Sequence, residues 1–415
     1  MAFARRSLGL VHRWFGLFIA AFLFIAGLTG AVISWDHELD GWLNPAFYVA
    51  RSPGPQRPAL ELADAVERAH PHVRVTYLPL VAESDEAMQI WVAPRVDPTT
   101  GQLHAVDWNQ VAVDPVSGVE QGRRDWGGVS FSRENVLPFL YKLHYSLEIP
   151  LVGGYDVGSL FMGIVAIVWV FDTFVALCLS FPSPRSWRKS FAFRWSKGGH
   201  ALLFDLHRSG GVWIWLLLLV LAVTAVSMNL RSQVVTPIVS MFSTLSSNPF
   251  DTRTAIAPEQ AAEPRTDRGR ILEIARAEGA RRGWAPPGGL LYSPEYGVYG
   301  IGFFAAGDEH GDGGLGNPWL YFDARDGSPA GADVPGTGSA GDIFLQAQFP
   351  LHSGRIIGLP GRILVSCLGL AVAMLSVTGV VIWFRKRRAK ARTDQLRARS
   401  GYSCTPSPPP SALLP

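Results

Sequence analysis

Three stretches of 22 residues contain no Asp, Glu, Lys or Arg, and they constrain the fold more than any other feature: residues 14–35, 209–230 and 363–384. A fourth stretch, residues 157–184, is interrupted by one charged residue, Asp172. A helix needs about 20 apolar residues to cross a bilayer core. We therefore predict an α-helical membrane protein with four transmembrane helices in contact with lipid. The first stretch is too long for an ordinary cleaved signal peptide, so we expect it to be retained.

Lys and Arg gather beside the ends of these stretches, in segments 5–13, 185–197 and 385–388. Basic residues flank membrane helices on the cytoplasmic side. This rule predicts that both termini are cytoplasmic, and that the long segments 36–155 and 231–354 lie in the periplasm of a bacterial cell. The predicted location is therefore the inner membrane. The net charge of +3 gives no electrostatic argument for a nucleic-acid partner.

Four pairs of short segments show that the chain is internally duplicated: LVHRWFG and LHRSGG, LELADA and LEIARA, VDPVSG and FDARDG, LHYS and LHSG. Each half is predicted to contain a membrane helix, a small α+β domain, a histidine segment and a second membrane helix. Within each domain a helix (60–69 or 271–280) should precede the strands. The Asp-x-x-x-Gly pieces are typical of hairpin turns.

The predicted organisation follows the duplication. Its segments are a cytoplasmic start with the first transmembrane helix (1–35), a first periplasmic domain with a histidine segment (36–155), a second transmembrane helix (156–184), a basic cytoplasmic link (185–204), a third transmembrane helix (205–230), a second periplasmic domain with a histidine segment (231–354), a fourth transmembrane helix (355–384) and a disordered cytoplasmic tail (385–415).

Four of the ten histidines fall at duplicated positions: His12, His144, His207 and His352. Both halves have the same orientation, so their symmetry axis should run along the membrane normal. Equivalent residues then lie at equal depth. We expect His12 to face His207 near the cytoplasmic surface, and His144 to face His352 near the outer surface.

Paired neutral imidazoles bind zinc, copper or haem. Tetrahedral zinc would need further ligands, and thiolate or carboxylate neighbours are missing. A haem iron needs only two axial nitrogens. No CxxCH motif is present, so a haem would be bound non-covalently as haem b. We therefore predict two haem b groups per chain, with the four histidines as iron ligands and no residue that is catalytic in its own right.

Four charged residues are further candidates for the cofactor sites. Three of them are arginines beside the histidines that would pair with haem propionates: Arg13, Arg208 and Arg355. For Arg13 and Arg208 the alternative is that they only set the membrane topology. Asp172 is an acid within a membrane span, which is costly and usually functional. It would accept a hydrogen bond from the outer nitrogen of His12 or His207, take part in proton movement, or make a buried structural hydrogen bond.

The glycine-rich segment 307–316 contains DEHGDGGLG. Its spacing lacks the last glutamate of a calcium loop, and it does not open a helix after a strand. We interpret it as an exposed loop. No other glycine motif for a flavin or nicotinamide is present, so the chain is not expected to oxidise NAD(P)H by itself.

Several motifs carry a resemblance to a known family: FDLHRSGGVWIW, VDPVSG, FDARDG, LHYSLEIP and VFDTFVALCLSFP. With them the chain resembles the PepSY-associated transmembrane family, up to about residue 390. The family includes iron-regulated inner-membrane proteins and siderophore reductases with two b-type haems. The resemblance implies four membrane helices, two PepSY-like periplasmic domains, and haem ligation by the four duplicated histidines. The short, glycine-rich external loops of the second half depart from the family, which leaves the substrate open.

The expected function is that of a ferric-chelate reductase. Electrons from membrane quinol or a cytoplasmic reductase would cross the membrane and reduce a ferric siderophore or another ferric chelate, so that Fe(II) is released for uptake. Two alternatives remain: a PepSY sensor or interaction protein without haem, and a quinone-linked cytochrome with another acceptor. A permease for iron complexes is disfavoured, because only four spans and no broken helix are expected.

Overall fold

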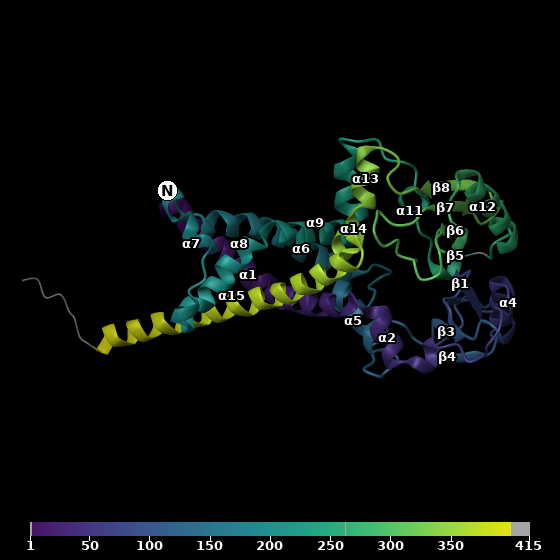
Figure 1. The fold of residues 1–415 in the computed structure, drawn as a ribbon, viewed down its shortest axis with the longest axis horizontal. Helices are drawn as coiled ribbons and strands as arrows, with labels where there is room; N and C mark the ends of the chain where they lie inside the picture. The colour runs from purple at the N-terminus through teal and green to yellow at the C-terminus, as the bar shows by residue number, and fades with distance from the viewer. Residues whose placement is uncertain (1, 262, 400–415) are drawn as a thin grey trace, which may run out of the picture.

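The computed structural model describes residues 2–261 and 263–399. Helices form one end of an elongated molecule and a β-sheet forms the other (Figure 1). Part of the predicted disordered tail, residues 400–415, lies outside the described residues. The prediction is wrong for residues 385–399, which continue helix α15 (Leu359–Arg399). Their Lys, Arg, Ala, Gln and Leu residues are good helix formers, so nothing ends the helix where the apolar stretch stops.

Within the described residues, three helices are long and apolar enough to cross a membrane. They are α1 (Ala2–Ile33), α6 (Val157–Ser180) and α15. Helices α1 and α15 cross closely at two glycines. A methyl group on Gly27 would lie 2.5 Å from the carbonyl oxygen of Gly369, and one on Gly369 would lie 2.5 Å from the carbonyl oxygen of Gly27. Small residues at this crossing therefore let the two backbones touch, as is common between membrane helices.

The predicted third membrane helix is broken. Helices α8 (Gly199–Trp213) and α9 (Trp215–Asn229) meet at Ile214 with a bend of 70°, so they form a fourth span only if they are taken together. Gly210 and Gly211 precede the break, and consecutive glycines weaken a helix. The prediction of one continuous helix is wrong here, and so is the argument against a permease that depended on it.

The remaining described helical elements lie in the segments that link α1 to α6, α6 to α8 and α9 to α15. They are α2 (Asp36–Leu43), α3 (Pro45–Tyr48), α4 (Ala59–Ala69), α5 (Val136–Ser146), η1 (Pro184–Ser186), α7 (Trp187–Phe191), η2 (Trp195–Lys197), η3 (Arg231–Val235), α10 (Thr236–Ser240), α11 (Pro249–Thr252), η4 (Pro258–Gln260), α12 (Arg268–Arg282), α13 (Ala340–Gln346), α14 (Gln348–Ser353) and η5 (Arg355–Ile357).

The described strands form one antiparallel sheet of eight, in the order β4-β3-β2-β1-β5-β6-β7-β8. Their bounds are β1 (Val73–Pro79), β2 (Met88–Pro94), β3 (Gln110–Val113), β4 (Glu120–Arg124), β5 (Pro287–Ser293), β6 (Val298–Phe303), β7 (Trp319–Asp323) and β8 (Pro329–Asp333). The predicted hairpin turns join β3 to β4 and β7 to β8. Helices α4 and α12 pack against the sheet over a shared apolar core that includes Leu62, Ile90, Ile271 and Ile301.

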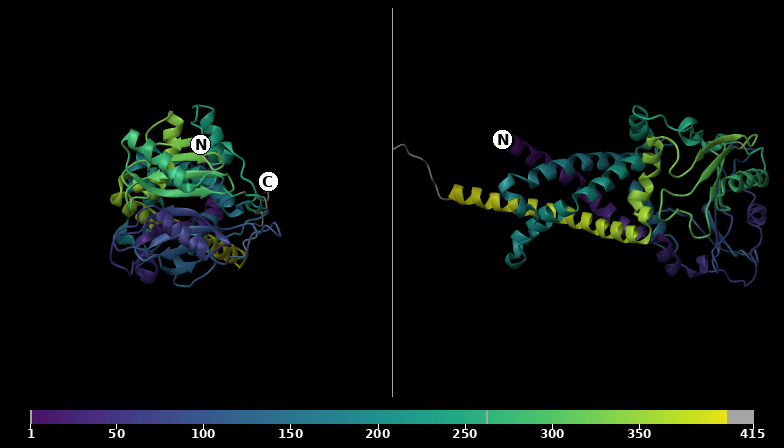
Figure 2. Two further views of the ribbon diagram at one scale, coloured as in Figure 1. Left: turned by 90° about the vertical axis from the view of Figure 1, so that its right-hand side faces the viewer. Right: turned by 45° about the horizontal axis from the view of Figure 1, so that its top comes forward.

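The two halves of the duplication share this sheet. Each half contributes one covering helix and four strands, and the halves join where β1 pairs with β5, for example at Leu78 and Leu290. The end-on view shows the two sets of strands side by side (Figure 2). Sequence analysis predicts two separate domains, whereas the structure has a continuous sheet. The pairing covers an edge strand in each half that would otherwise expose its backbone groups.

Candidate functional site

The first histidine pair lies at the end of the helical bundle far from the sheet, which we call the tail end. His12 comes from α1 and His207 from α8. Their ring centres are 6.1 Å apart and their planes are inclined by 46°. One residue comes from each half of the duplication, so the pair bridges the two halves.

The second histidine pair lies at the opposite end of the bundle, which we call the sheet end. His144 comes from α5 and His352 from α14. Their ring centres are also 6.1 Å apart, with planes inclined by 62°. The structure thus groups the four histidines as the duplication suggests, one pair at each end.

Each ring is held through Nδ1 by a residue of its own half. The Nδ1 atoms of His144 and His207 lie 3.0 Å from the backbone oxygens of Ala26 and Leu375 respectively. A carbonyl oxygen can only accept a hydrogen bond, so Nδ1 carries the proton in both rings. This tautomer leaves the lone pair on Nε2, which is the nitrogen free to bind a metal.

Three threonines that sequence analysis missed support the rings from the same side. Thr29 Oγ1 is 3.2 Å from Nδ1 of His144, Thr224 Oγ1 is 2.9 Å from Nδ1 of His352, and Thr378 Oγ1 is 3.1 Å from Nδ1 of His207. The sequence offset of the duplication could have identified two of these threonines. Thr29 and Thr224 are 195 positions apart, the same offset that separates the histidines of the tail-end pair.

Asp172 supports the fourth ring. Its two carboxylate oxygens lie 2.9 and 3.0 Å from Nδ1 of His12, and the residue is 6% exposed. Among the described residues, no other carboxylate bonds to any of the four histidines. A carboxylate behind a metal-binding imidazole fixes its orientation and raises its basicity. The tail-end pair therefore differs in charge from the sheet-end pair.

Two glycines make room for the rings. A methyl group on Gly30 would lie 2.9 Å from Cε1 of His144, and one on Gly379 would lie 2.9 Å from Cε1 of His207. Contacts this short are not tolerated, so a side chain at either position would displace the imidazole. Sequence analysis did not identify either glycine.

A cavity of about 860 Å³ opens between the helices at the tail end. It is lined by both histidines of the tail-end pair and by Asp172. Trp169, Phe204, Trp215 and Trp383 contribute aromatic walls. Binding sites for small organic molecules and cofactors have volumes of roughly 300–1,000 Å³ and mostly apolar walls, so this cavity has the size and lining of a cofactor site.

Basic side chains also line this cavity: Arg5, Arg13, Arg208, Lys386, Arg387 and Lys390. Arg13 is exposed. Arg208 stacks on Phe204 at 5.2 Å and donates to the backbone oxygen of Lys189, but its buried Nε atom has no hydrogen-bond partner among the described residues. A buried N–H group of this kind is costly unless a bound group accepts its hydrogen bond.

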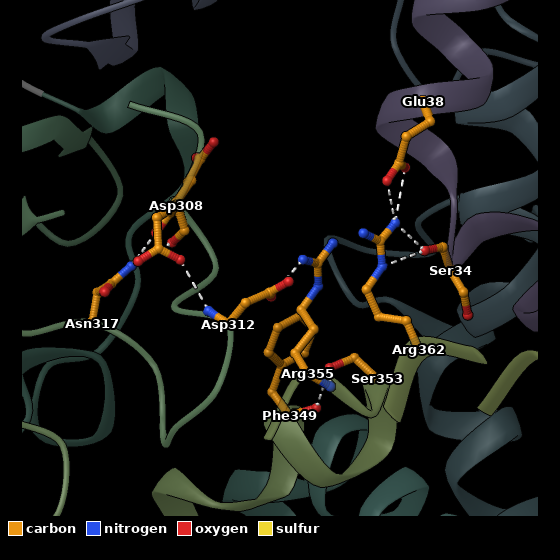
Figure 3. Close-up of polar contacts among 10 residues, drawn as sticks. Ser34, Glu38, Asp308, Asp312, Asn317, Phe349, Ser353, Arg355 and Arg362 are labelled. Carbon is orange, nitrogen blue, oxygen red and sulfur yellow. Dashed lines mark hydrogen bonds and ion pairs between the residues drawn. The ribbon is translucent and has the colours of Figure 1, made fainter. Parts of the chain in front are cut away.

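Arg355 has a different setting from the other two arginines. Its Nη1 atom donates to Asp312 at 2.7 Å (Figure 3). Its backbone oxygen accepts from the N–H of Gly313 at 2.8 Å. These contacts attach the glycine-rich loop 307–316 to the sheet end of the bundle. The loop is largely exposed, as the sequence predicts, but it is anchored at a site that the sequence does not reveal. Arg355 is thus already paired within the chain.

The loop also approaches the sheet-end histidines through stacked rings. His310 stacks on Phe349, with ring centres 6.0 Å apart and planes inclined by 26°. Phe349 lies three residues before His352, on the same face of α14. Side chains from the loop therefore reach to within one helical turn of the sheet-end pair.

The sequence model of a known family, described as the PepSY-associated TM region, matches residues 10–386. The matched segment contains all four apolar stretches, the shared sheet and both histidine pairs. No curated protein matches the chain significantly. Because the match covers most of the sequence, the chain belongs to the PepSY-associated transmembrane family.

Proposed function

We propose that this protein is a membrane cytochrome that holds one haem b between His12 and His207 and another between His144 and His352. The observation that carries the proposal is the spacing of 6.1 Å in both pairs. A metal–imidazole bond of about 2.0 Å, with the ring centre about 1.1 Å beyond the nitrogen, separates two axial rings by about 6.2 Å. Both pairs match this requirement, although they lie in different parts of the bundle.

Three further observations support a fit to haem. The Nδ1 atoms of the rings are engaged by the protein, which leaves Nε2 for iron. The tail-end cavity has aromatic walls and basic residues that suit a macrocycle with two propionates. The partnerless Nε of Arg208 suits a propionate oxygen, so Arg208 and Arg13 are the proposed propionate partners. Arg355 is a weaker candidate because it pairs with Asp312.

We propose that the chain passes electrons from the tail end to the sheet end and reduces ferric siderophores or other ferric chelates there. The bound groups would supply one-electron transfer. The basic clusters beside the membrane helices support a tail end in the cytoplasm of a bacterial cell and a sheet in the periplasm. A quinol would supply two electrons and release two protons, and two ferric chelates would each accept one electron. The family resemblance supports iron as the substrate.

The residues of the chain have defined roles in this proposal. The aromatic walls of the tail-end cavity exclude water, while Asp172 and the threonines orient the rings. At the sheet end, the loop 307–316 and the sheet stand where a ferric chelate would approach. Two experiments separate this proposal from its alternatives. The first distinguishes it from a non-redox sensor, and the second distinguishes it from a quinone-linked cytochrome.

The first experiment is a reduced-minus-oxidised absorption spectrum of the detergent-purified chain, with a haem-to-protein ratio. We expect two b-type haems, and each single His→Ala substitution in the two pairs should remove about one. His200→Ala is the matched control, because His200 is exposed on α8 and should leave both haems in place. Protein that folds and binds no haem would contradict the proposal and favour the sensor.

The second experiment tests the acceptor. The haem protein is reduced with dithionite, freed of excess reductant and mixed anaerobically with a ferric siderophore. Rapid reoxidation with trapping of Fe(II) by ferrozine is expected. Haem that stays reduced with every ferric chelate but reoxidises with a quinone would instead identify a quinone-linked cytochrome.

A further inference from the structure

A group of three metal-binding side chains lies at the sheet end, outside both histidine pairs. His37 belongs to α2, and Glu83 and Glu86 belong to the loop between β1 and β2. One ligand atom from each residue lies within 4.8 Å of the other two. His37 Nε2 is 3.3 Å from Glu86 Oε1 and 3.9 Å from Glu83 Oε1. One imidazole and two carboxylates thus converge on a space that a single ion can fill.

The imidazole is held in place by packing. The ring of His37 contacts the ring of Tyr48 edge-on, with centres 5.5 Å apart. The hydroxyl of Tyr48 donates to Asp40 at 2.7 Å, and Asp40 forms a buried ion pair with Arg124 at 2.6 Å. Because this network is buried, it fixes the surface against which His37 rests.

The two carboxylates are positioned by a tight turn. The backbone N–H of Glu86 donates to the carbonyl oxygen of Glu83 at 3.3 Å, and Asp85 within the turn has a left-handed φ of 63°. The turn is tied to α3 because Ala87 N donates to the carbonyl oxygen of Tyr48 at 2.7 Å. The turn therefore presents the side chains of Glu83 and Glu86, its first and fourth residues, beside His37.

No described Lys or Arg compensates the charge of this group. The ion-pair partner of both Glu83 and Glu86 in the described chain is His37, which is charged only when it is protonated. The contrast with Glu67 is clear, since Glu67 pairs with both Arg95 and Arg268. Two carboxylates this close repel each other unless a proton or a cation intervenes.

The group lies next to the proposed reducing end. His37 is seven residues beyond Gly30, which contacts the ring of His144. On the other side, a methyl group on Gly307 would lie 2.7 Å from the carboxylate of Glu83. Gly307 opens the same loop that carries His310 towards the sheet-end pair. A metal ion released at the sheet end would therefore be released in the part of the molecule that holds this group.

We propose that His37, Glu83 and Glu86 form a binding site for a divalent first-row metal ion, with Fe(II) as the natural occupant. Imidazole and carboxylate donors suit Mn(II), Fe(II) and Zn(II). The side chains of His37 and Glu83 are 50% and 42% exposed, so water completes the coordination and the ion can exchange. The choice of Fe(II) rests on the proposed function, whereas the binding of a divalent ion does not.

The test uses Mn(II) as a redox-inert probe, titrated into the detergent-purified full chain and followed by the electron paramagnetic resonance signal of free Mn(II). We expect one site in the wild type. His37→Gln and Glu86→Gln should each weaken binding at least tenfold, because changes even in the residues behind metal ligands cost 10–100-fold. Glu83→Gln should do the same, and it should leave the fold intact because the side chain of Glu83 is 42% exposed.

His70→Gln is the matched control. His70 also contacts a glutamate, Glu120, at 2.8 Å, but Glu120 pairs with Arg123 and no second carboxylate joins the pair. Mn(II) binding should be unchanged in this variant. No binding by wild type up to millimolar Mn(II), or equal binding by the triple variant of all three site residues, would overturn the proposal.

Haem content is measured in the same samples, so the two proposals fail separately. Protein that binds Mn(II) but no haem would retain the metal site and refute the cytochrome. Protein that binds two haems but no Mn(II) would retain the cytochrome and refute the metal site. Size-exclusion profiles and thermal unfolding establish that each variant is folded before its affinity is compared.

Discussion

Replacing Asp172 by Asn tests the cofactor assignment at a residue that would not itself ligate iron. The substitution keeps the size of the side chain and an oxygen that accepts from Nδ1 of His12, but it removes the negative charge. We expect the tail-end haem to remain bound and its midpoint potential to rise, because the carboxylate stabilises the more positive, oxidised state.

The magnitude follows from the geometry. The carboxylate oxygen lies 2.9 Å from Nδ1 of His12. With about 2 Å between iron and Nε2 and about 2.2 Å across the ring, the charge sits about 7 Å from the proposed iron position. At an effective dielectric constant of about 20, two unit charges at this distance interact by about 2 kcal/mol. For a one-electron couple this corresponds to a shift of about 100 mV.

Spectroelectrochemical titration of the purified variant measures the shift. The control is Asp156→Asn at the other end of the same helix, where Asp156 accepts from the backbone N–H of Ser159. Asparagine caps helices about as well as aspartate, so this variant should leave the tail-end potential unchanged. If Asp172→Asn moves neither midpoint, or lowers the tail-end one, then the His12 ring does not ligate iron as proposed.

Three further predictions test the packing. Gly30→Val should remove the sheet-end haem and Gly379→Val the tail-end haem, measured as loss of about half the absorbance, because each new Cβ meets an imidazole at 2.9 Å. Asp114→Ala should destabilise the sheet by about 3 kcal/mol in chemical unfolding, since four backbone N–H groups lose their acceptor. Burial opposes the charge of Asp114, but these hydrogen bonds hold the pKa of its carboxyl well below the usual value. The contribution of Asp114 to the free energy of unfolding is therefore complete above about pH 4 and is lost as the pH falls further. Asp40→Ala should cost about 3–5 kcal/mol, because it leaves the buried Arg124 charge unpaired.

The duplication explains why the histidine pairs were predictable. Two halves with the same orientation place equivalent residues at equal depth, so His12 with His207, and His144 with His352, follow from sequence offsets alone. The same reasoning extends to Thr29 and Thr224, which are separated by the same offset as His12 and His207. Gly379 could not be found in this way, since its role depends on which face of α15 meets the ring of His207.

Other features depend on three-dimensional direction, which hydropathy and motifs do not record. An apolar stretch shows how long a helix is but not that it turns by 70° at Ile214. Each half has the strands of a small domain. Nothing in the sequence shows, however, that strand β1 pairs with strand β5, where Leu78 lies opposite Leu290. The anchoring of the glycine-rich loop is similar, because Asp312 and Arg355 are 43 positions apart and meet only in the folded chain.

The difference between the two pairs gives the proposed electron path a direction. Three of the four rings are held by neutral carbonyl or hydroxyl groups, and His12 alone is held by a carboxylate. In the proposed cytochrome, a negative charge behind one ligand would lower the potential of the tail-end centre relative to the sheet-end centre, by the same interaction that the Asp172 variant removes. Electrons would then pass towards the sheet end with a favourable free energy. In wild-type protein the lower midpoint should therefore belong to the haem that is lost in His207→Ala, and the reverse order would show that Asp172 does not set the direction.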